Sequence, residues 1–324
     1  MPLGTLWCVN ESLSAHRSGA DPVTRGLVLP DGRRGCLLDG GDPSGSPVIG
    51  LHGTPGCRLN RMLDDSVYAE AGVRYVTTDR AGYGMATRHR GRSVADEAAD
   101  VLAVADALGL DRFAVVGGSG GGPHALACAA LLGDRVSRVA CQSSLAPLGE
   151  RGLARERWLD GMDPESAAEL EWAEAGETVL TGEMEAAQAL MQRRVDEDPG
   201  ALLGAEAPDG DVRFLVRPEV VEAFRRIVPE QARHGVGGSV DDTLAFASDW
   251  GFDLAQIDVP VLLTYGVRDT SCPPAHGRFL AAAIPTAIVF EVGEGGHFAD
   301  DPRAEVLATH RWLRHGGLPE AWPT

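Results

Sequence analysis

Short apolar segments alternate with longer segments of helical periodicity along most of the chain. The apolar segments predict about eight strands, at residues 25–30, 35–39, 48–51, 73–78, 113–117, 136–142, 261–265 and 287–292. Asp31 and Gly32 separate the first two segments and indicate a hairpin turn. Strands that alternate with helices favour an α/β fold, with a mostly parallel sheet flanked by helices.

Helical periodicity between and after these strands predicts the helices that would cover the sheet. They fall at residues 62–71, 93–108, 123–132, 274–283 and 302–315, and Ser93 is the expected N-cap of the second. The alternation stops after Ser144 and resumes near Trp250. We therefore expect a core formed by residues 1–145 and 249–324, with a helical cap, or lid, inserted at residues 146–248.

The expected cap has helical patterns and no strand-like run. Its helices are predicted at residues 153–162, 165–177, 183–195 and 218–227, with breaks at Pro199, Gly200, Pro208 and Gly210. Large apolar side chains lie among its alanines and glutamates, and they include Trp158, Met162, Trp172, Met184, Met191, Phe214 and Phe224. Most would form the interior of the cap, and some would face a substrate cleft.

Composition and charge narrow the chemistry. The 324 residues are 44% hydrophobic and 23% charged, which suits a globular protein with a full core. All 29 basic residues are arginine. The absence of lysine excludes lysine Schiff-base chemistry and a Walker-type phosphate loop. The 47 acidic residues give a formal net charge of -18, which argues against nucleic acid as a partner and is typical of a soluble surface.

Cysteine spacing and the amino-terminal residues set expectations about metals and location. The six cysteines show neither a C-x-x-C pair nor zinc-ligand spacing, so we expect reduced thiols and no metal site. Residues 1–17 lack the features of a signal peptide, and no run of about 18 apolar residues would span a membrane. A cytoplasmic protein is the expectation, and the sequence leaves a homodimer open.

A glycine-rich turn carries the first candidate for catalysis. Residues 117–121 read Gly-Gly-Ser-Gly-Gly and fit the pattern G-x-S-x-G, which carries little weight alone in a chain with 41 glycines. A strand-like run leads into it and a helix-like run leads out, so Ser119 falls on a strand-to-helix turn. Glycine suits the crowded positions beside such a turn. Ser119 would stand at a helix N-terminus, where N–H groups favour an adjacent oxyanion.

A second loop follows the strand predicted at residues 48–51. Its sequence at residues 52–56 is His-Gly-Thr-Pro-Gly. Ligands bind at the carboxyl ends of strands in open α/β sheets, so a backbone N–H of this loop can point into the cleft. We assign the N–H of Thr54 and the N–H of Gly120 as oxyanion donors. His52 could act as a base, but its place in a tight loop favours a role in holding that loop.

With both loops, the sequence resembles the α/β-hydrolase-fold serine hydrolases that have a His-Gly-x-Pro-Gly oxyanion loop. The resemblance spans about residues 25–315. It includes the segment Asp-Arg-Ala-Gly-Tyr-Gly at residues 79–84, similar to the family's D-R-P-G-Y-G with Ala81 in place of proline. The resemblance implies a catalytic triad in the chain order nucleophile, acid, histidine.

The other two triad members are expected after later strands. Asp269 lies a few residues past the segment 261–265, and the corresponding place after the segment 136–142 contains no carboxylate. His297 follows the last predicted strand in a glycine-rich loop. His276 and His310 fall within predicted helices. We therefore expect Ser119 as nucleophile, Asp269 as acid and His297 as base.

Substrate and reaction follow less directly from the sequence. We expect hydrolysis of an ester of an apolar small molecule through an acyl-enzyme, without a metal or an organic cofactor. The candidate substrate contacts are His124, soon after the nucleophile, and Trp158 and Trp172 in the cap. An epoxide hydrolase or haloalkane dehalogenase is disfavoured, because those relatives have aspartate at the place of Ser119.

Two alternatives stay open. The oxyanion loop is similar to that of proline iminopeptidases, which have glycine at the place of Thr54 and bind the amino terminus of the substrate with cap carboxylates. Glutamates at positions 169, 171, 174 and 177 could serve that purpose, although a solvated helix face also explains them. A small-molecule receptor, or a member of the fold with a non-hydrolytic biosynthetic role, is the alternative from another class.

Overall fold

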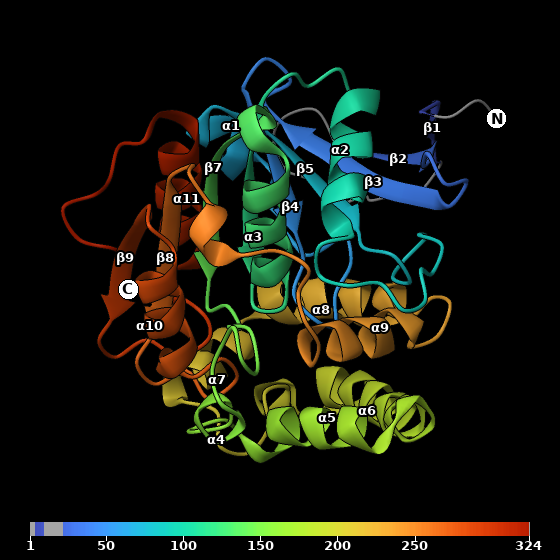
Figure 1. Cartoon of the computed structure of the whole chain (residues 1–324), viewed down its shortest axis with the longest axis vertical. Helices are drawn as coiled ribbons and strands as arrows, with labels where there is room; N and C mark the ends of the chain where they lie inside the picture. Colours follow the sequence, from blue (N-terminus) through green and yellow to red (C-terminus); the bar gives the residue numbers. More distant parts are fainter. Residues whose placement is uncertain (1–3, 10–21, 324) are drawn as a thin grey trace.

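The computed structural model describes residues 4–9 and 22–323, and its centre is one mixed sheet (Figure 1). Within these residues the sheet has nine strands in the order β1-β2-β3-β5-β4-β6-β7-β8-β9. Pairing is antiparallel from β1 to β3 and between β3 and β5, and parallel across the rest of the sheet. The strands are β1 (Leu6–Cys8), β2 (Val23–Val28), β3 (Arg34–Gly41), β4 (Ser46–Leu51), β5 (Val73–Asp79), β6 (Phe113–Gly118), β7 (Val136–Gln142), β8 (Val261–Gly266) and β9 (Ala287–Val292).

The predicted α/β fold with a mostly parallel sheet is confirmed, with one strand more than the pattern indicates. The additional strand is β1 at the sheet edge, where Trp7 pairs with Gly26 of β2. A Cβ at Gly26 would lie 2.3 Å from the Trp7 ring, so glycine makes room for the indole. Three residues are too few to show an alternating pattern. The hairpin between β2 and β3 turns at Gly32, with φ of 88°.

Five helices cover the two faces of the sheet. They are α1 (Ser66–Ala71), α2 (Glu97–Ala107), α3 (Gly121–Leu131), α10 (Pro274–Ala283) and α11 (Pro302–His315). The helix α2 begins later than predicted, and its N-cap is Asp96 instead of Ser93. The Ser93 N–H and hydroxyl both donate to the Asp96 carboxylate, so Ser93 belongs to the turn before the helix. Short 3₁₀ helices lie at Gly133–Arg135, Pro199–Ala201 and Leu254–Gln256.

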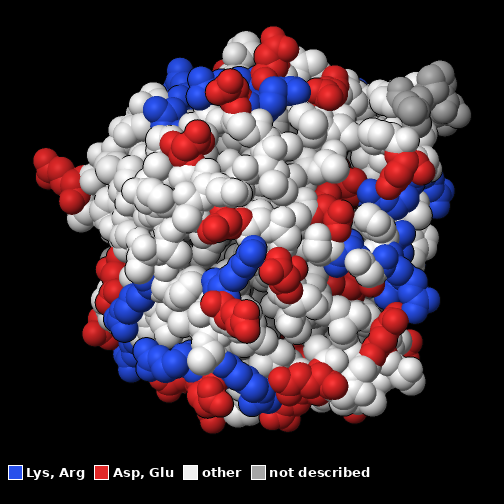
Figure 2. All heavy atoms as spheres, in the orientation of Figure 1, with Lys and Arg blue, Asp and Glu red and all other residues white. Residues whose placement is uncertain are grey.

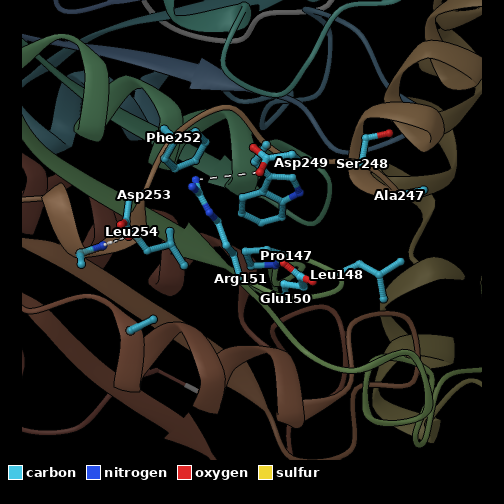
Figure 3. Close-up of a pocket in the computed structure, with 13 residues that line it drawn as sticks. Pro147, Leu148, Glu150, Arg151, Ala247, Ser248, Asp249, Phe252, Asp253 and Leu254 are labelled. Atoms are coloured by element: carbon cyan, nitrogen blue, oxygen red, sulfur yellow. Dashed lines mark hydrogen bonds and ion pairs between the residues drawn. The ribbon is translucent and has the colours of Figure 1, made fainter.

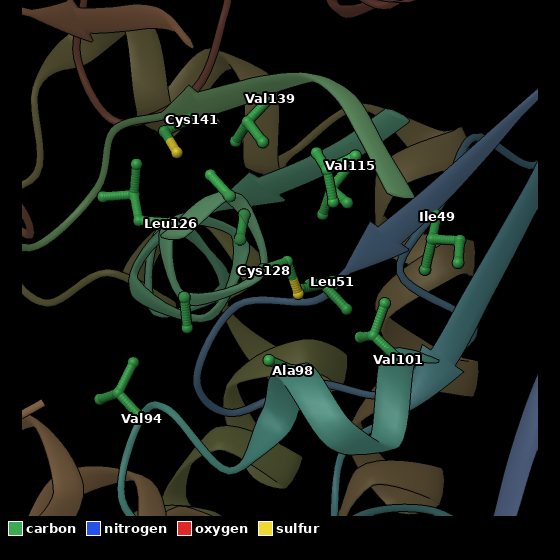
Figure 4. Close-up of a cluster of buried hydrophobic side chains, with 14 of the residues drawn as sticks. Ile49, Leu51, Val94, Ala98, Val101, Val115, Leu126, Cys128, Val139 and Cys141 are labelled. Atoms are coloured by element: carbon green, nitrogen blue, oxygen red, sulfur yellow. The ribbon is translucent and has the colours of Figure 1, made fainter. Parts of the chain in front are cut away.

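Alternation along each central strand builds a separate core on each face of the sheet. On β6, Val115 joins the cluster shared with α2, α3 and α10, whereas Val116 joins the cluster shared with α1 and α11. Figure 4 shows Val115 and Val139 of the first cluster above α3, whose Leu126 and Cys128 are fully buried. Both faces of the parallel strands are therefore buried, which explains their continuous apolar runs.

The inserted helices, α4–α9, lie between β7 and β8 in the chain and gather beyond one end of the sheet (Figure 1). They are α4 (Arg155–Trp158), α5 (Pro164–Ala175), α6 (Glu177–Glu197), α7 (Asp209–Leu215), α8 (Pro218–Gln231) and α9 (Gly237–Phe246). The sequence pattern overestimates α4 and misses α7 and α9. Pro208 and Gly210 look like a break, yet Pro208 immediately precedes α7 and Gly210 lies within it. The cap boundaries at residues 146 and 248 stay a prediction.

The surface carries charges of both signs. Figure 2 shows Asp and Glu side chains interspersed with arginines over the visible face. Many form ion pairs between exposed side chains, such as Arg155 with Glu174 and Arg278 with Glu291. Within residues 4–9 and 22–323, no helix is both long and apolar enough to cross a membrane.

Candidate functional site

The turn between β6 and α3 holds Ser119 in a strained conformation. Its φ is 52°, in the left-handed region that residues other than glycine rarely adopt. The Ser119 N–H donates to the carbonyl of Gln142 at 2.8 Å, which ties the turn to β7. A Cβ at Gly117 would lie 2.3 Å from the Gly121 carbonyl oxygen, and a Cβ at Gly121 would lie 2.2 Å from that of Leu51. The glycines are therefore required by close backbone approaches, as the motif predicts.

The two predicted oxyanion donors lie side by side. A Cβ at Gly120 would be 3.1 Å from the Thr54 backbone nitrogen and 2.4 Å from Thr54 Oγ1. A Cβ at Gly53 would be 3.3 Å from Ser119 Cβ. The loop after β4 thus packs directly against the Ser119 turn. Backbone nitrogens on either side of a serine are the arrangement that binds an oxyanion in acyl transfer.

His52 holds this loop through both ring nitrogens. Its Nδ1 donates to the Gly53 carbonyl at 2.7 Å, and its Nε2 accepts the Arg80 N–H at 3.1 Å. Burial holds the pKa of His52 well below its usual value, and the nearby Arg80 guanidinium acts in the same direction. The neutral imidazole therefore has both nitrogens occupied by the backbone, which leaves none for a base.

His297 and Asp269 are in direct contact. His297 Nδ1 lies 3.0 Å from Asp269 Oδ2 and 3.1 Å from Oδ1. The Asp269 side chain is fully buried, and its Oδ1 accepts the N–H groups of Ser271 and Cys272 at 2.9 Å. Burial acts to lower the pKa of His297, but the adjacent Asp269 carboxylate raises it above its usual value overall. A carboxylate in this position orients an imidazole and stabilises its protonated form.

Ser119 and the Asp269 loop border one cavity of about 70 Å³. Ser119, Gly120 and Thr54 line it together with Ser271 and Cys272, the two residues whose N–H groups hold Asp269. Among the residues that the structure describes, no hydrogen bond joins the Ser119 hydroxyl to the His297 ring, whose Nδ1 contacts Asp269. Such hydrogen bonds are often long in unliganded enzymes and tighten when substrate binds.

The remaining wall of this cavity comes largely from the inserted helices. The larger apolar lining residues are Leu145, Trp158, Met162, Leu170 and Phe246. Trp158 is 6% exposed, and its indole N–H donates to the Ala146 carbonyl at 2.9 Å, which fixes the ring. Of the three predicted substrate contacts, the structure thus brings Trp158 to the cavity that Ser119 borders.

His124 and Trp172 do not line this cavity. His124 is fully buried on α3, with ring nitrogens 3.2 Å from Asp242 Oδ1 and 3.3 Å from the Val94 carbonyl oxygen. Trp172 packs on a cluster formed by Leu180, Met184 and Val240 of the inserted helices. The His124 ring instead lies behind this wall, with its centroid 5.7 Å from that of the Phe246 ring, which does line the cavity. Trp172 is half-buried among the inserted helices.

Glu169 also reaches the cavity, unlike its neighbours in the predicted acidic run. Burial raises the pKa of the Glu169 carboxyl group to about 7. Glu171 is exposed, Glu174 pairs with Arg155 on the surface, and Glu177 pairs with Arg90. The acidic run is therefore mainly a solvated helix face, from which one carboxyl group enters the site.

A buried charge cluster ties α9 to the loop after β4. Asp242, which is fully buried, accepts hydrogen bonds from Thr54 Oγ1 at 2.7 Å, Arg80 at 2.6 Å, Tyr83 at 2.7 Å and Arg92 at 2.5 Å. Burial opposes the charge of Asp242, but Arg80 and Arg92 hold the pKa of this carboxyl well below its usual value. The helix α9 is absent from the sequence-based prediction, so this cluster was missed.

A second, larger cavity of about 510 Å³ lies apart from these residues (Figure 3). It is lined by residues that include Arg151, Asp249, Phe252 and Leu254, and an ion pair of 3.9 Å joins Arg151 and Asp249 across it. None of the predicted site residues lines this cavity. Among the described residues, no group of three His, Cys, Asp or Glu side chains could hold a metal ion.

Comparison with known proteins identifies the family. The sequence profile described as alpha/beta hydrolase fold matches residues 46–301, most of the chain. The chain belongs to the alpha/beta hydrolase fold family. Open α/β sheets bind ligands at the carboxyl ends of their strands. This is where the Ser119 turn and the loop after β4 lie, and the residues Asp269 and His297 follow the carboxyl ends of β8 and β9.

The chain is similar in sequence to two proline iminopeptidases and in fold to a solved esterase. A proline iminopeptidase from Xylella fastidiosa (strain 9a5c) is 36% identical over 311 residues, which cover 89% of this chain and 95% of that protein. A proline iminopeptidase from Xanthomonas citri is 27% identical over 303 residues, covering 87% and 93%. The solved esterase RhEst1 from Rhodococcus sp. ECU1013 has a TM-score of 0.61 at 19% identity, covering 91% of this chain and 99% of that one. This last likeness concerns the fold.

Proposed function

We propose that this protein is a serine hydrolase that cleaves a carboxylic ester, or a related acyl bond, of an apolar small molecule. The observation that carries the proposal is the Ser119 turn, with φ of 52° and the backbone nitrogens of Thr54 and Gly120 beside it. The contact of 3.0 Å between His297 and Asp269 supports a base and an orienting acid. The triad is therefore Ser119, Asp269 and His297.

Acylation begins when His297 takes the proton of the Ser119 hydroxyl as Oγ attacks the carbonyl carbon. The carbonyl oxygen becomes an oxyanion, which the N–H groups of Thr54 and Gly120 bind. Asp269 accepts a hydrogen bond from the Nδ1–H group of His297 and stabilises the imidazolium, without itself being protonated. The imidazolium then protonates the leaving alkoxide, which departs as an alcohol. Ser119 keeps the acyl group as an ester.

Deacylation repeats these steps with water as the nucleophile. His297 takes a proton from water as its oxygen attacks the acyl carbon, and the same N–H groups bind the second oxyanion. The imidazolium returns its proton to Ser119 Oγ as the acyl bond to the serine breaks. The products are a carboxylic acid and the free enzyme. The apolar wall with Trp158 and Leu170, and a volume of about 70 Å³, favour a small apolar group beside Ser119.

A second candidate is a proline iminopeptidase-like aminopeptidase, and Glu169 is the observation that favours it. This carboxyl group lines the cavity with Ser119, and its ionised form would pair with a substrate amine. The proline iminopeptidases among the relatives lend this candidate weight. Thr54 argues against the aminopeptidase, because those enzymes are expected to have glycine at this position.

Covalent labelling tests the serine-hydrolase proposal. A fluorophosphonate probe should label the folded wild-type protein at Ser119, because the oxygen of an activated serine displaces fluoride from phosphorus and forms a phosphonate ester. Ser119→Ala is the matched control, since it removes one oxygen atom, and it should stay unlabelled. An unlabelled wild-type protein, shown to be folded by circular dichroism, would refute the proposal.

Turnover of two substrate types separates the candidates. An esterase should hydrolyse p-nitrophenyl esters of short acyl groups faster than prolyl p-nitroanilide, as judged by kcat/KM. A clear preference for the prolyl anilide would favour the aminopeptidase instead. Ser119→Ala should abolish both activities, because either reaction proceeds through the same acyl-enzyme.

A further inference from the structure

The loop that carries His297 is held by a carboxylate from the inserted helices. Asp211, in the first turn of α7, is fully buried. Its Oδ2 accepts the backbone N–H of His297 and its Oδ1 accepts that of Phe298, both at 2.8 Å. Two hydrogen bonds to a charged acceptor fix the backbone of the loop at the residue that bears the imidazole.

The sequence of the loop accommodates this carboxylate. A Cβ at Gly296 would lie 2.3 Å from Asp211 Oδ2 and 2.6 Å from the carboxyl carbon. The φ of Gly296 is not in the positive range that favours glycine. Glycine is required here because the Asp211 carboxylate leaves no room for a Cβ. The glycine before His297 in the Gly-Gly-His sequence at residues 295–297 therefore permits the close approach of Asp211.

The same helix and the residues after it also contact the loop beyond His297. The rings of Phe214 and Phe298 stack, with centroids 4.4 Å apart and planes at 22°. Farther along, the Arg217 guanidinium donates to the Asp300 carbonyl. These contacts come from α7 and from Arg217, two residues after its end, so the position of the His297 loop depends on the position of this helix.

We propose that Asp211 is a positioning residue that holds the His297 loop in its working geometry and adds negative charge beside the imidazole. The inference rests on the proposed function, because that function assigns His297 as the base. Asp211 touches neither the serine nor the expected place of the substrate, so it acts through His297. Asp269, Asp211 and Asp163 each raise the pKa of His297 against the effect of burial.

The variant Asp211→Asn tests this role, with Asp209→Asn as the matched control. Both positions lie in the first turn of α7, but Asp209 is exposed. Asparagine offers one acceptor oxygen for two N–H groups and carries no charge. For p-nitrophenyl acetate we expect Asp211→Asn to lower kcat by ~10- to 100-fold, the range for a misplaced catalytic group, and to change KM by less than about twofold. Asp209→Asn should retain the wild-type values.

The pH profile separates positioning from a purely structural effect. Loss of the Asp211 charge should move the acidic midpoint of kcat/KM to lower pH, whereas a simple loss of folded protein scales the profile without moving it. A wild-type kcat together with a wild-type midpoint in Asp211→Asn would overturn the proposal. If that variant does not fold, Gly296→Ala takes its place, because the added methyl group displaces Asp211, and a wild-type kcat there would overturn the proposal equally.

A measurement without turnover keeps this inference distinct from the proposed function. The imidazole of His297 can be titrated by NMR, with His297→Gln to assign its signal. Asp211→Asn should lower the midpoint relative to Asp209→Asn, and equal midpoints would count against the proposal. A wild-type protein that fluorophosphonate leaves unlabelled, but whose His297 midpoint still responds to Asp211→Asn, would refute the serine hydrolase while the hold of Asp211 on His297 stands.

Discussion

Replacing Asp242 with asparagine tests whether the buried charge cluster supports the loop after β4. The substitution preserves the shape of the side chain but removes the charge that Arg80 and Arg92 share. The side chains of Asp242 and Arg80 are 0% exposed and that of Arg92 is 1% exposed, so water cannot hydrate the unpaired guanidinium groups. Arginine keeps its proton in proteins, so the cluster cannot relax by losing the positive charge.

The size of the effect follows from this burial. Removing one partner of a buried ion pair costs about 3–5 kcal/mol of unfolding free energy. We expect Asp242→Asn to fall in this range. Thr54 Oγ1, which donates to Asp242 at 2.7 Å, would also lose a charged acceptor. The adjacent N–H should bind the oxyanion less well, and kcat should fall by ~10-fold or more, a part of the loss from deleting such a donor.

Asp241→Asn is the control for Asp242→Asn. Asp241 is the preceding residue on α9 and also pairs with an arginine, but the Arg88 side chain is 32% exposed and can be hydrated. This variant should lose about 1 kcal/mol or less, as partly exposed pairs do. Urea unfolding followed by tryptophan fluorescence gives both values. Equal losses in the two variants, or a loss below about 1 kcal/mol for Asp242→Asn, would refute the reasoning.

The titratable groups in and near the site give three more expectations. His297 must be neutral to take the Ser119 proton, and its pKa is raised, so kcat/KM should fall as the pH drops through a midpoint above 6.5; a lower midpoint would contradict this. Glu169→Gln should lower kcat/KM for prolyl p-nitroanilide about tenfold or more if Glu169 pairs with an amine. Equal small changes for ester and anilide would exclude that pairing. Burial lowers the pKa of His310 to about 4, so below pH 6.5 the unfolded chain binds a proton that the folded chain does not. Wild type should therefore lose about 2 kcal/mol of unfolding free energy that His310→Phe keeps when the pH falls from 8 to 5. Urea titrations at the two pH values measure this, and a constant difference would contradict it.

The features that the sequence predicts well are those coded locally. The glycines around Ser119 adjoin it in sequence, and the apolar runs of β4 and β6 mark the strands that end at the site. The inserted helices are harder to predict. Glycines 237 and 238 begin α9, and Gly210 lies inside α7, so the residues typical of breaks fall within helices that tertiary packing stabilises. Gly238 illustrates this, because a Cβ there would lie 2.6 Å from the Tyr83 ring.

Buried carboxylates are the part of the site that sequence patterns could not supply. Asp242 acts on Thr54, 188 positions away, and Asp211 acts on His297, 86 positions away. In the sequence both resemble surface acids of an acidic chain. Their roles depend on partners that only the fold brings together, and the local pattern contains no sign of those partners.

The inserted helices and the loops of the sheet therefore both contribute residues to one site. The sequence predicts a core that holds the proposed triad and a cap that covers it. In the structure, α9 supplies the carboxylate that holds the Thr54 loop, and α7 supplies the one that holds the His297 loop. Because both carboxylates are fully buried, any large movement of these helices would expose or unpair them at a cost of several kcal/mol. The helices α7 and α9 are thus better described as supports of the two site loops than as a freely opening lid. Substrate should enter past α4 and α5, because Trp158 of α4, Glu169 of α5 and Met162 between these helices line the cavity.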